Sequence, residues 1–231
     1  MKVILIIITA IAAAISLPTF NEKHILDFGN TSDIISAFCN CVVAGAAVMA
    51  FLSAKNWIYQ RMHDDAYKIA KEIIFDDYNN IFEIGNLAIS NIENFKTIEK
   101  YIHNDINDFV SINMCKDNIK LFTEAKNTPI TTNAKIKKAT RLGWELKSEA
   151  YALHSIFMKE YSMIEEINLR FWSRIERMLI ISEDTKNRAV MTSSLRELLV
   201  KHDEEKLNFY KAYDNLSLYS KDITSYFNIK K

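Results

Sequence analysis

The sequence predicts an all-α protein, with an N-terminal two-helix transmembrane hairpin followed by a cytosolic antiparallel bundle of long helices. The 231 residues include only four glycines and two prolines, too few for a turn-rich sandwich, a barrel or a glycine-rich nucleotide loop. Between residues 3 and 54 only four side chains carry a formal charge, which is typical of membrane segments: Glu22, Lys23, Asp27 and Asp33. Beyond residue 54, apolar residues recur at intervals of three and four, the period of an amphipathic helix.

The first apolar segment covers residues 3–17 and is followed by Pro18. A helix over residues 3–20 would be about 27 Å long, slightly less than the roughly 30 Å hydrocarbon core of a bilayer. Lys2, the short apolar run and the three alanines at 12–14 also fit a secretory signal peptide that is cleaved. We favour a retained helix, because the apolar run continues past these alanines and a second apolar segment follows closely.

The second apolar segment, residues 34–54, has 21 residues without a charge, equivalent to about 31 Å of helix. It divides the chain into a hairpin region at 1–54 and a cytosolic region at 55–231. The loop between the spans holds one basic residue against three acidic ones, whereas basic residues follow the second span. The positive-inside rule therefore places both termini in the cytoplasm. Three residues are expected to anchor the second span at the membrane interface: Trp57, Tyr59 and Arg61.

Small and polar residues gather on one side of the second predicted helix. At 100° per residue, that side carries Ser36, Ala37, Asn40, Cys41 and Ala44. Gly45 continues the small-residue spacing set by Ala37 and Cys41, which permits close helix approach. The first segment offers a matching stripe of Thr9, Ala13 and Ser16.

Two interpretations of this pattern remain open. In one, the hairpin packs on itself and Asn40 bonds to the neighbouring helix. In the other, several hairpins form a homo-oligomer in the lipid bilayer, and Ser36 and Asn40 line a polar path. Neither span contains Asp, Glu, Lys or Arg, which argues against an ion-coupled transporter.

The cytosolic region is near neutral in charge and shows helical periodicity throughout. The expected break around Pro129 and the other polar clusters predict helices at about 34–77, 79–103, 105–126, 133–183 and 187–214, followed by a short tail helix. No run alternates with period two, so no strand is predicted.

Two groups of cations are candidate contacts for a partner. One group lies at the start of the helix expected after Pro129, where cations oppose the helix dipole: Lys135, Lys137, Lys138 and Arg141. The cluster is either a solvated face or a contact for an anionic partner, nucleic acid or lipid. The second group forms one stripe, either solvated or facing a partner: Arg170, Arg174 and Arg177. Tyr210 and Tyr213 fit the edge of a core better than a platform for stacking nucleic-acid bases.

The sequence does not predict an enzyme. It contains no phosphate-binding loop, no dinucleotide-binding glycine motif and no H-E-x-x-H zinc motif. The five histidines are widely spread, so we expect no metal site and no cofactor.

The order of parts resembles a known class of protein. Its features are the N-terminal hairpin, the span FCNCVVAGAAVMAFLSAKNW and the cytosolic opening KNWIYQRMHDDAYKIAKEII. This layout is similar to the two-helix membrane effectors of bacterial anti-phage systems, especially those of retrons.

The resemblance implies an inner-membrane effector of abortive infection that a reverse transcriptase and its RNA–DNA product hold silent. On release, the hairpins would permeabilise or depolarise the membrane, and the cluster at residues 135–141 would be a contact for the nucleic acid. The alternative function is a membrane-anchored helical scaffold or sensor that binds a cytosolic partner without toxicity.

Overall fold

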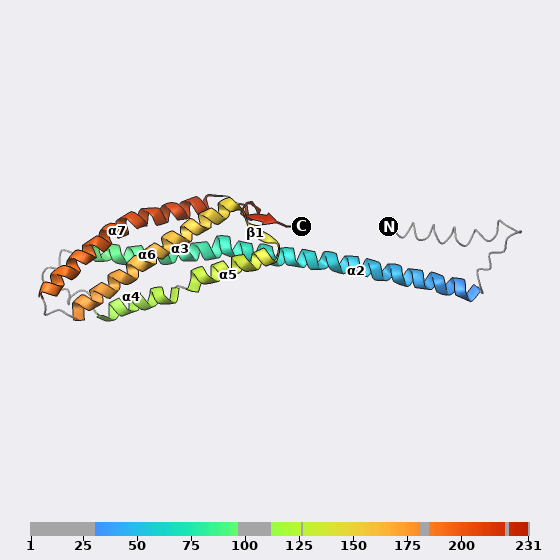
Figure 1. Ribbon diagram of the computed structural model, residues 1–231, viewed down its shortest axis with the longest axis horizontal. Helices are drawn as coiled ribbons and strands as arrows, with labels where there is room; N and C mark the ends of the chain where they lie inside the picture. The colour runs from blue at the N-terminus through green and yellow to red at the C-terminus, as the bar shows by residue number, and fades with distance from the viewer. Residues whose placement is uncertain (1–30, 97–111, 126, 181–184, 220–221, 231) are drawn as a thin grey trace. The chain divides into compact units, whose positions relative to one another are not determined.

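The computed structural model describes residues 31–96, 112–125, 127–180, 185–219 and 222–230. The predicted first span and its residues Thr9, Ala13 and Ser16 lie outside the described residues. The helices are α2 (Thr31–Lys71), the π-helix η2 (Glu72–Asp77), α3 (Tyr78–Lys96), α4 (Ile112–Ala125), α5 (Asn127–Arg141), α6 (Ser148–Ile180) and α7 (Thr185–Ser217). Two short strands are β1 (Trp144–Leu146) and β2 (Phe227–Ile229), with one 3₁₀ turn, η5, at Ile223–Ser225 (Figure 1).

The chain divides into two compact units, Met1–Ile58 and Tyr59–Lys231. The described part of the first unit is residues 31–58, which form the greater part of α2. Within the described residues, one helix is long and apolar enough to cross a membrane, and none of its most apolar stretch is buried. The second unit is helical and has its own core, as predicted for the region after the spans.

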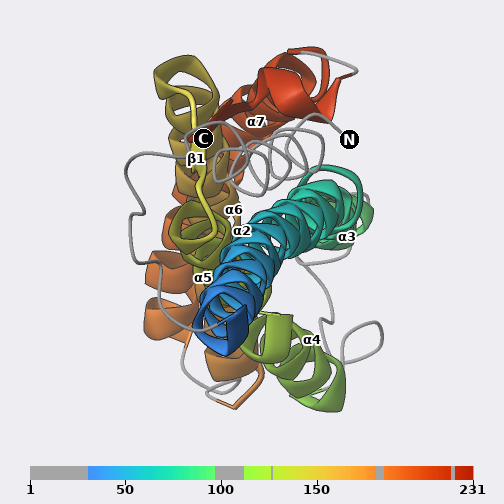
Figure 2. The same ribbon diagram turned by 90° about the vertical axis from the view of Figure 1, so that its right-hand side faces the viewer.

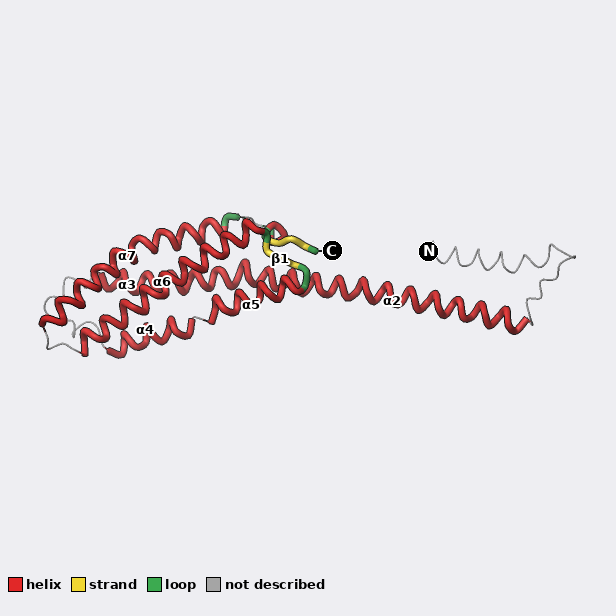
Figure 3. The backbone as a smooth tube through the Cα atoms, in the orientation of Figure 1, coloured by secondary structure: helices red, strands yellow, loops and turns green. Residues whose placement is uncertain are grey.

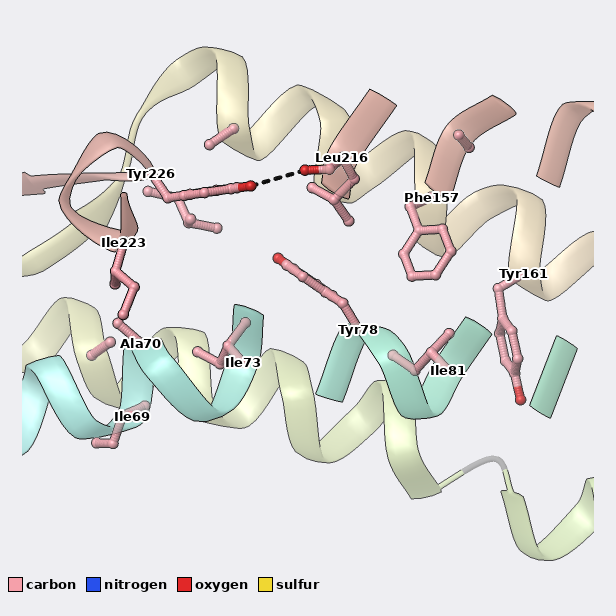
Figure 4. Close-up of a cluster of buried hydrophobic side chains, with 14 of the residues drawn as sticks. Ile69, Ala70, Ile73, Tyr78, Ile81, Phe157, Tyr161, Leu216, Ile223 and Tyr226 are labelled. Carbon is pink, nitrogen blue, oxygen red and sulfur yellow. Dashed lines mark hydrogen bonds between the residues drawn. The ribbon is translucent and has the colours of Figure 1, made fainter. Parts of the chain in front are cut away.

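The core of the second unit is organised around α6, which packs against α3, α4 and α7 (Figure 2). One cluster of buried side chains includes Trp144, Phe157 and Phe209, and Figure 4 shows part of it. There the Tyr226 hydroxyl donates to the Leu216 carbonyl oxygen at 2.9 Å. A second cluster, farther along α6, includes Trp172.

The π-helix η2 aligns the buried faces of α2 and α3. The end of α2 buries Ala66, Ile69 and Ala70, whereas the α3 face includes Ile81 and Ala88. In an unbroken α-helix these two faces would point about 90° apart, at 100° per residue. The wider π turn accommodates roughly one extra residue, a slip of about 100°. Both faces therefore enter the same core.

The long helix predicted at 133–183 is wrong, because the chain turns at residues 142–147, near the start of that range. α5 already begins at Asn127, with Pro129 in its first turn, where a missing backbone N–H costs little. It ends at Arg141, and Gly143 follows with φ of 91°, a conformation that favours glycine. α6 starts at Ser148. The period of the apolar residues continues across this turn, which is why the pattern suggested one helix.

The prediction that the chain has no strand is also wrong, and so is the predicted tail helix. β1 and β2 pair antiparallel, with Trp144 opposite Ile229 and Leu146 opposite Phe227 (Figure 3). Three-residue strands are too short to show alternation in the sequence. Among the described residues between α7 and β2, the helical structure is the single turn η5, which Asp222 caps by accepting from the Thr224 N–H.

Candidate functional site

The site residues predicted in the second span lie on α2. Ser36, Ala37, Asn40, Cys41 and Ala44 are exposed, and Gly45 is half-buried. Their apolar neighbours are exposed too, including Phe38, Val42, Val43, Met49 and Phe51. The hydrophobic effect disfavours such a surface in water, whereas a bilayer accommodates it.

The predicted interfacial residues follow directly on the same helix. Trp57 and Tyr59 are exposed, and Arg61 lies 3.9 Å from Asp65 in an exposed ion pair one turn along α2. An exposed pair of this kind contributes little to stability. Aromatic and basic side chains in this place suit the headgroup region of a membrane.

Lys135 does not belong to an exposed cluster, because it points toward η2. Its Nζ donates to Asp77 Oδ1 at 2.7 Å and lies 3.5 Å from Glu72 Oε2. Burial by itself lowers the pKa of Lys135, but the hydrogen bond to Asp77 and the charges of Asp77 and Glu72 raise it overall. We call these three residues the Lys135 clamp. The clamp fastens α5 to the π turn, so Lys135 is not available to nucleic acid.

The expectation that these cations oppose the helix dipole is wrong. Because α5 starts at Asn127, Lys138 and Arg141 occupy its last turn, where positive charge is favourable. Lys137, Lys138 and Arg141 remain exposed. The positions of these cations therefore agree with the helix dipole and give no reason to expect a partner. Only the exposure of the three side chains still favours one.

The predicted arginine stripe on α6 is divided among three environments. Arg170 pairs with Glu166 one turn earlier. Arg174 Nη1 donates to the Ser194 carbonyl oxygen at 2.7 Å and so joins α6 to α7. Arg177 is exposed. At least one of the three residues is therefore used to hold the bundle together.

The two tail tyrosines lie at a seam between α7 and α3. The Tyr213 ring stacks on Phe82 at 4.0 Å between centroids, and the Tyr210 hydroxyl donates to Asn86 Oδ1 at 2.7 Å. Farther along the seam, Lys206 pairs with Glu93. The structure thus places both tyrosines at the edge of the core, the interpretation that the sequence favoured.

A polar network around the buried His154 was not predicted from the sequence. His154 Nε2 lies 3.1 Å from Asn133 Oδ1, which can only accept, so Nε2 carries the proton. The Tyr78 hydroxyl then donates to Nδ1 at 3.1 Å. Burial lowers the pKa of His154 to about 4, so the ring is neutral at pH 7. A histidine within the apolar stripe of α6 was the available signal.

The described residues offer no group of three or more His, Cys, Asp or Glu side chains that could hold a metal ion. Burial, aided by the charge of Glu176, raises the pKa of the buried Cys115 thiol to about 11. The thiol is therefore protonated at neutral pH and a poor nucleophile. Comparison of the chain with protein-family models, with curated proteins and with solved structures finds no match.

Proposed function

We propose that this protein is an effector of the bacterial inner membrane, with both termini cytoplasmic, whose spans assemble to permeabilise or depolarise the membrane. The observation that carries the proposal is the exposed apolar surface of α2, continuous in sequence with a helical unit that has its own core. The exposed apolar side chains of the first unit need an apolar environment, and a bilayer supplies it.

Assembly of several copies is part of the proposal. Two helices cannot enclose an aqueous pore, so a path for ions needs more than one hairpin. The face with Ala37, Cys41 and Gly45 permits close helix approach, and Ser36 and Asn40 would supply its polar groups.

The second unit would hold the assembly silent through a cytosolic partner. The resemblance to retron effectors suggests a reverse transcriptase and its RNA–DNA product as that partner. The exposed cations Lys137, Lys138 and Arg141 are the candidates in this unit for a nucleic-acid contact, now without Lys135.

The experiment is induced expression in bacteria while membrane potential is followed with a dye. We expect rapid depolarisation that Asn40→Leu and Gly45→Leu abolish, because both changes fill the small, polar face. Ala46→Leu, at least about 100° around α2 from both positions, is the matched control and should leave depolarisation intact. Normal growth at high expression would overturn the proposal and favour a membrane-anchored scaffold or sensor.

A fractionation tests the membrane assignment by itself. After lysis without detergent and high-speed centrifugation, we expect the full-length chain in the membrane pellet. Its recovery in the supernatant would contradict the assignment of α2 as a span.

A further inference from the structure

The outward face of α5 combines exposed cations with an exposed apolar side chain. The helix contains four cations and no acidic residue. Lys135 is turned inward in the Lys135 clamp. On the helical wheel, Ile130, Ala134, Lys137, Lys138 and Arg141 fall within an arc of about 100°. All five are exposed, Ile130 by 65%. We call this arc the basic face of α5.

Contacts within the second unit place the C-terminal end of this face beside the last turns of α2. Trp144, three residues after α5, donates from Nε1 to His63 Nδ1 at 3.1 Å. Its ring also contacts Tyr67, with 5.9 Å between centroids. At the other end of the contact, Lys135 reaches Glu72 and Asp77. α5 therefore runs antiparallel to residues 63–77.

The charges on this side of the unit are predominantly uncompensated cations. On residues 63–77 and on α5, five exposed cations form no ion pair: Lys68, Lys71, Lys137, Lys138 and Arg141. The acids on residues 63–77 are Asp64, Asp65, Glu72, Asp76 and Asp77, and three of these are already paired: Asp65 with Arg61, and both Glu72 and Asp77 with Lys135. The surface is therefore suited to an anionic partner.

A short length of chain joins this face to the uncharged run that we propose spans the bilayer. The uncharged run ends at Ala54, and His63, which contacts Trp144, follows nine residues later. Nine residues of helix are about 14 Å long, so the chain keeps His63 within about 14 Å of the end of the uncharged run, and the headgroup layer covers roughly the first 5–8 Å beyond the hydrocarbon core. The negative potential of a cytoplasmic leaflet reaches about a Debye length, 8 Å, farther.

We infer that the basic face of α5 binds anionic lipid headgroups of the membrane that α2 enters, and so docks the helical unit on the membrane surface. The inference rests on the proposed function only in taking α2 as a span. A single helix face with an exposed isoleucine suits a lipid surface, where apolar and cationic side chains act together. Nucleic acid is the competing partner, and the test separates the two.

The test uses the full-length chain in nanodiscs, with Cys39→Ser and Cys41→Ser and a fluorophore attached through Ala134→Cys. The remaining Cys115 is buried. Energy transfer from this fluorophore to an acceptor on a neutral lipid reports the approach of α5 to the bilayer. We expect transfer to rise when phosphatidylglycerol is added to phosphatidylcholine, and this rise to be lost at high salt.

The combined variant Lys137→Ser, Lys138→Ser and Arg141→Ser should also lose the rise. The matched control changes three exposed lysines on other helices, Lys116, Lys120 and Lys211, to serine and should keep it. Transfer that does not respond to phosphatidylglycerol in the parent chain overturns the inference, whether or not the variant folds.

A second measurement tests whether nucleic acid, rather than lipid, binds the basic face of α5. A labelled RNA–DNA oligonucleotide is added to the same chain in neutral nanodiscs. Binding that requires Lys137, Lys138 and Arg141, without any lipid response, would overturn lipid docking and assign the face to nucleic acid. If lipid docking fails while induced depolarisation persists, the proposed function stands and only this inference falls.

Discussion

Replacing Lys135 tests whether this lysine holds the fold or faces a partner. Asp77 is 7% exposed, and its Oδ2 has no hydrogen-bond partner among the described residues. Lys135→Met keeps the aliphatic stem but leaves this carboxylate without its cation. Breaking a fully buried ion pair costs about 3–5 kcal/mol. The Lys135 side chain is 33% exposed, so solvent screens part of the interaction, and we expect a loss of about 2 kcal/mol.

The assay is thermal unfolding of the full-length chain in detergent, followed by near-UV circular dichroism of the buried Trp144 and Trp172. For a chain of this length, about 2 kcal/mol corresponds to a Tm lower by roughly 4–8 °C. Lys137→Met removes the same charge from an exposed position on the same helix and should change stability by less than about 0.5 kcal/mol.

A double-mutant cycle isolates the interaction. In an Asp77→Asn background, Lys135→Met should cost less, because the neutral amide needs no counter-ion, and we expect a coupling of at least about 1 kcal/mol. Equal melting temperatures for Lys135→Met and Lys137→Met would refute the assignment of Lys135 to the clamp.

Three further predictions use the same unfolding assay. Gly85→Ala should destabilise the second unit by about 1–2 kcal/mol, because the new Cβ would overlap the Phe209 ring and outweigh the gain in helix propensity; an unchanged Tm would contradict this packing. Because burial lowers the pKa of His154 to about 4, the unfolded chain binds its proton more readily, so stability should fall by up to about 3 kcal/mol as pH drops from about 6.5 to 4. His154→Gln should reduce this pH dependence, and an identical pH profile would exclude the histidine as its source. Deleting Phe75, which is exposed, should convert η2 to an α-helix but keep the faces of α2 and α3 aligned, because the deletion removes the one extra residue that the π turn accommodates; unfolding should stay cooperative, and loss of cooperative unfolding would contradict this role of η2. Phe75→Ala is the control and should unfold cooperatively.

Local periodicity predicted much of the second unit. The apolar residues of the helix predicted at 133–183 include Phe157, Ile164, Phe171 and Ile175, and all four are buried on α6. Their spacing places them on one face of a helix, and this apolar face must be buried in whichever way the helices pack. The boundary expected near residue 78 falls where η2 meets α3, but the chain stays helical there.

The candidate basic cluster was only partly predictable. Spacing alone placed Lys135 with Lys137, Lys138 and Arg141, but it could not say where the helix begins. The start at Asn127 reverses their relation to the helix dipole, and the wheel then separates Lys135 from the other three. This separation assigns Lys135 to the Lys135 clamp and leaves Lys137, Lys138 and Arg141 as the candidate contact for an anionic partner.

The sequence by itself determined that the chain is mainly helical and where an uncharged apolar helix lies, because charge content and a period of 3.6 residues are local properties. Only the tertiary structure decided that Lys135 binds Asp77, that His154 lies between Tyr78 and Asn133, and that β1 pairs with β2. These contacts join residues tens of positions apart, and their free energy depends on how helices pack, which no local spacing records.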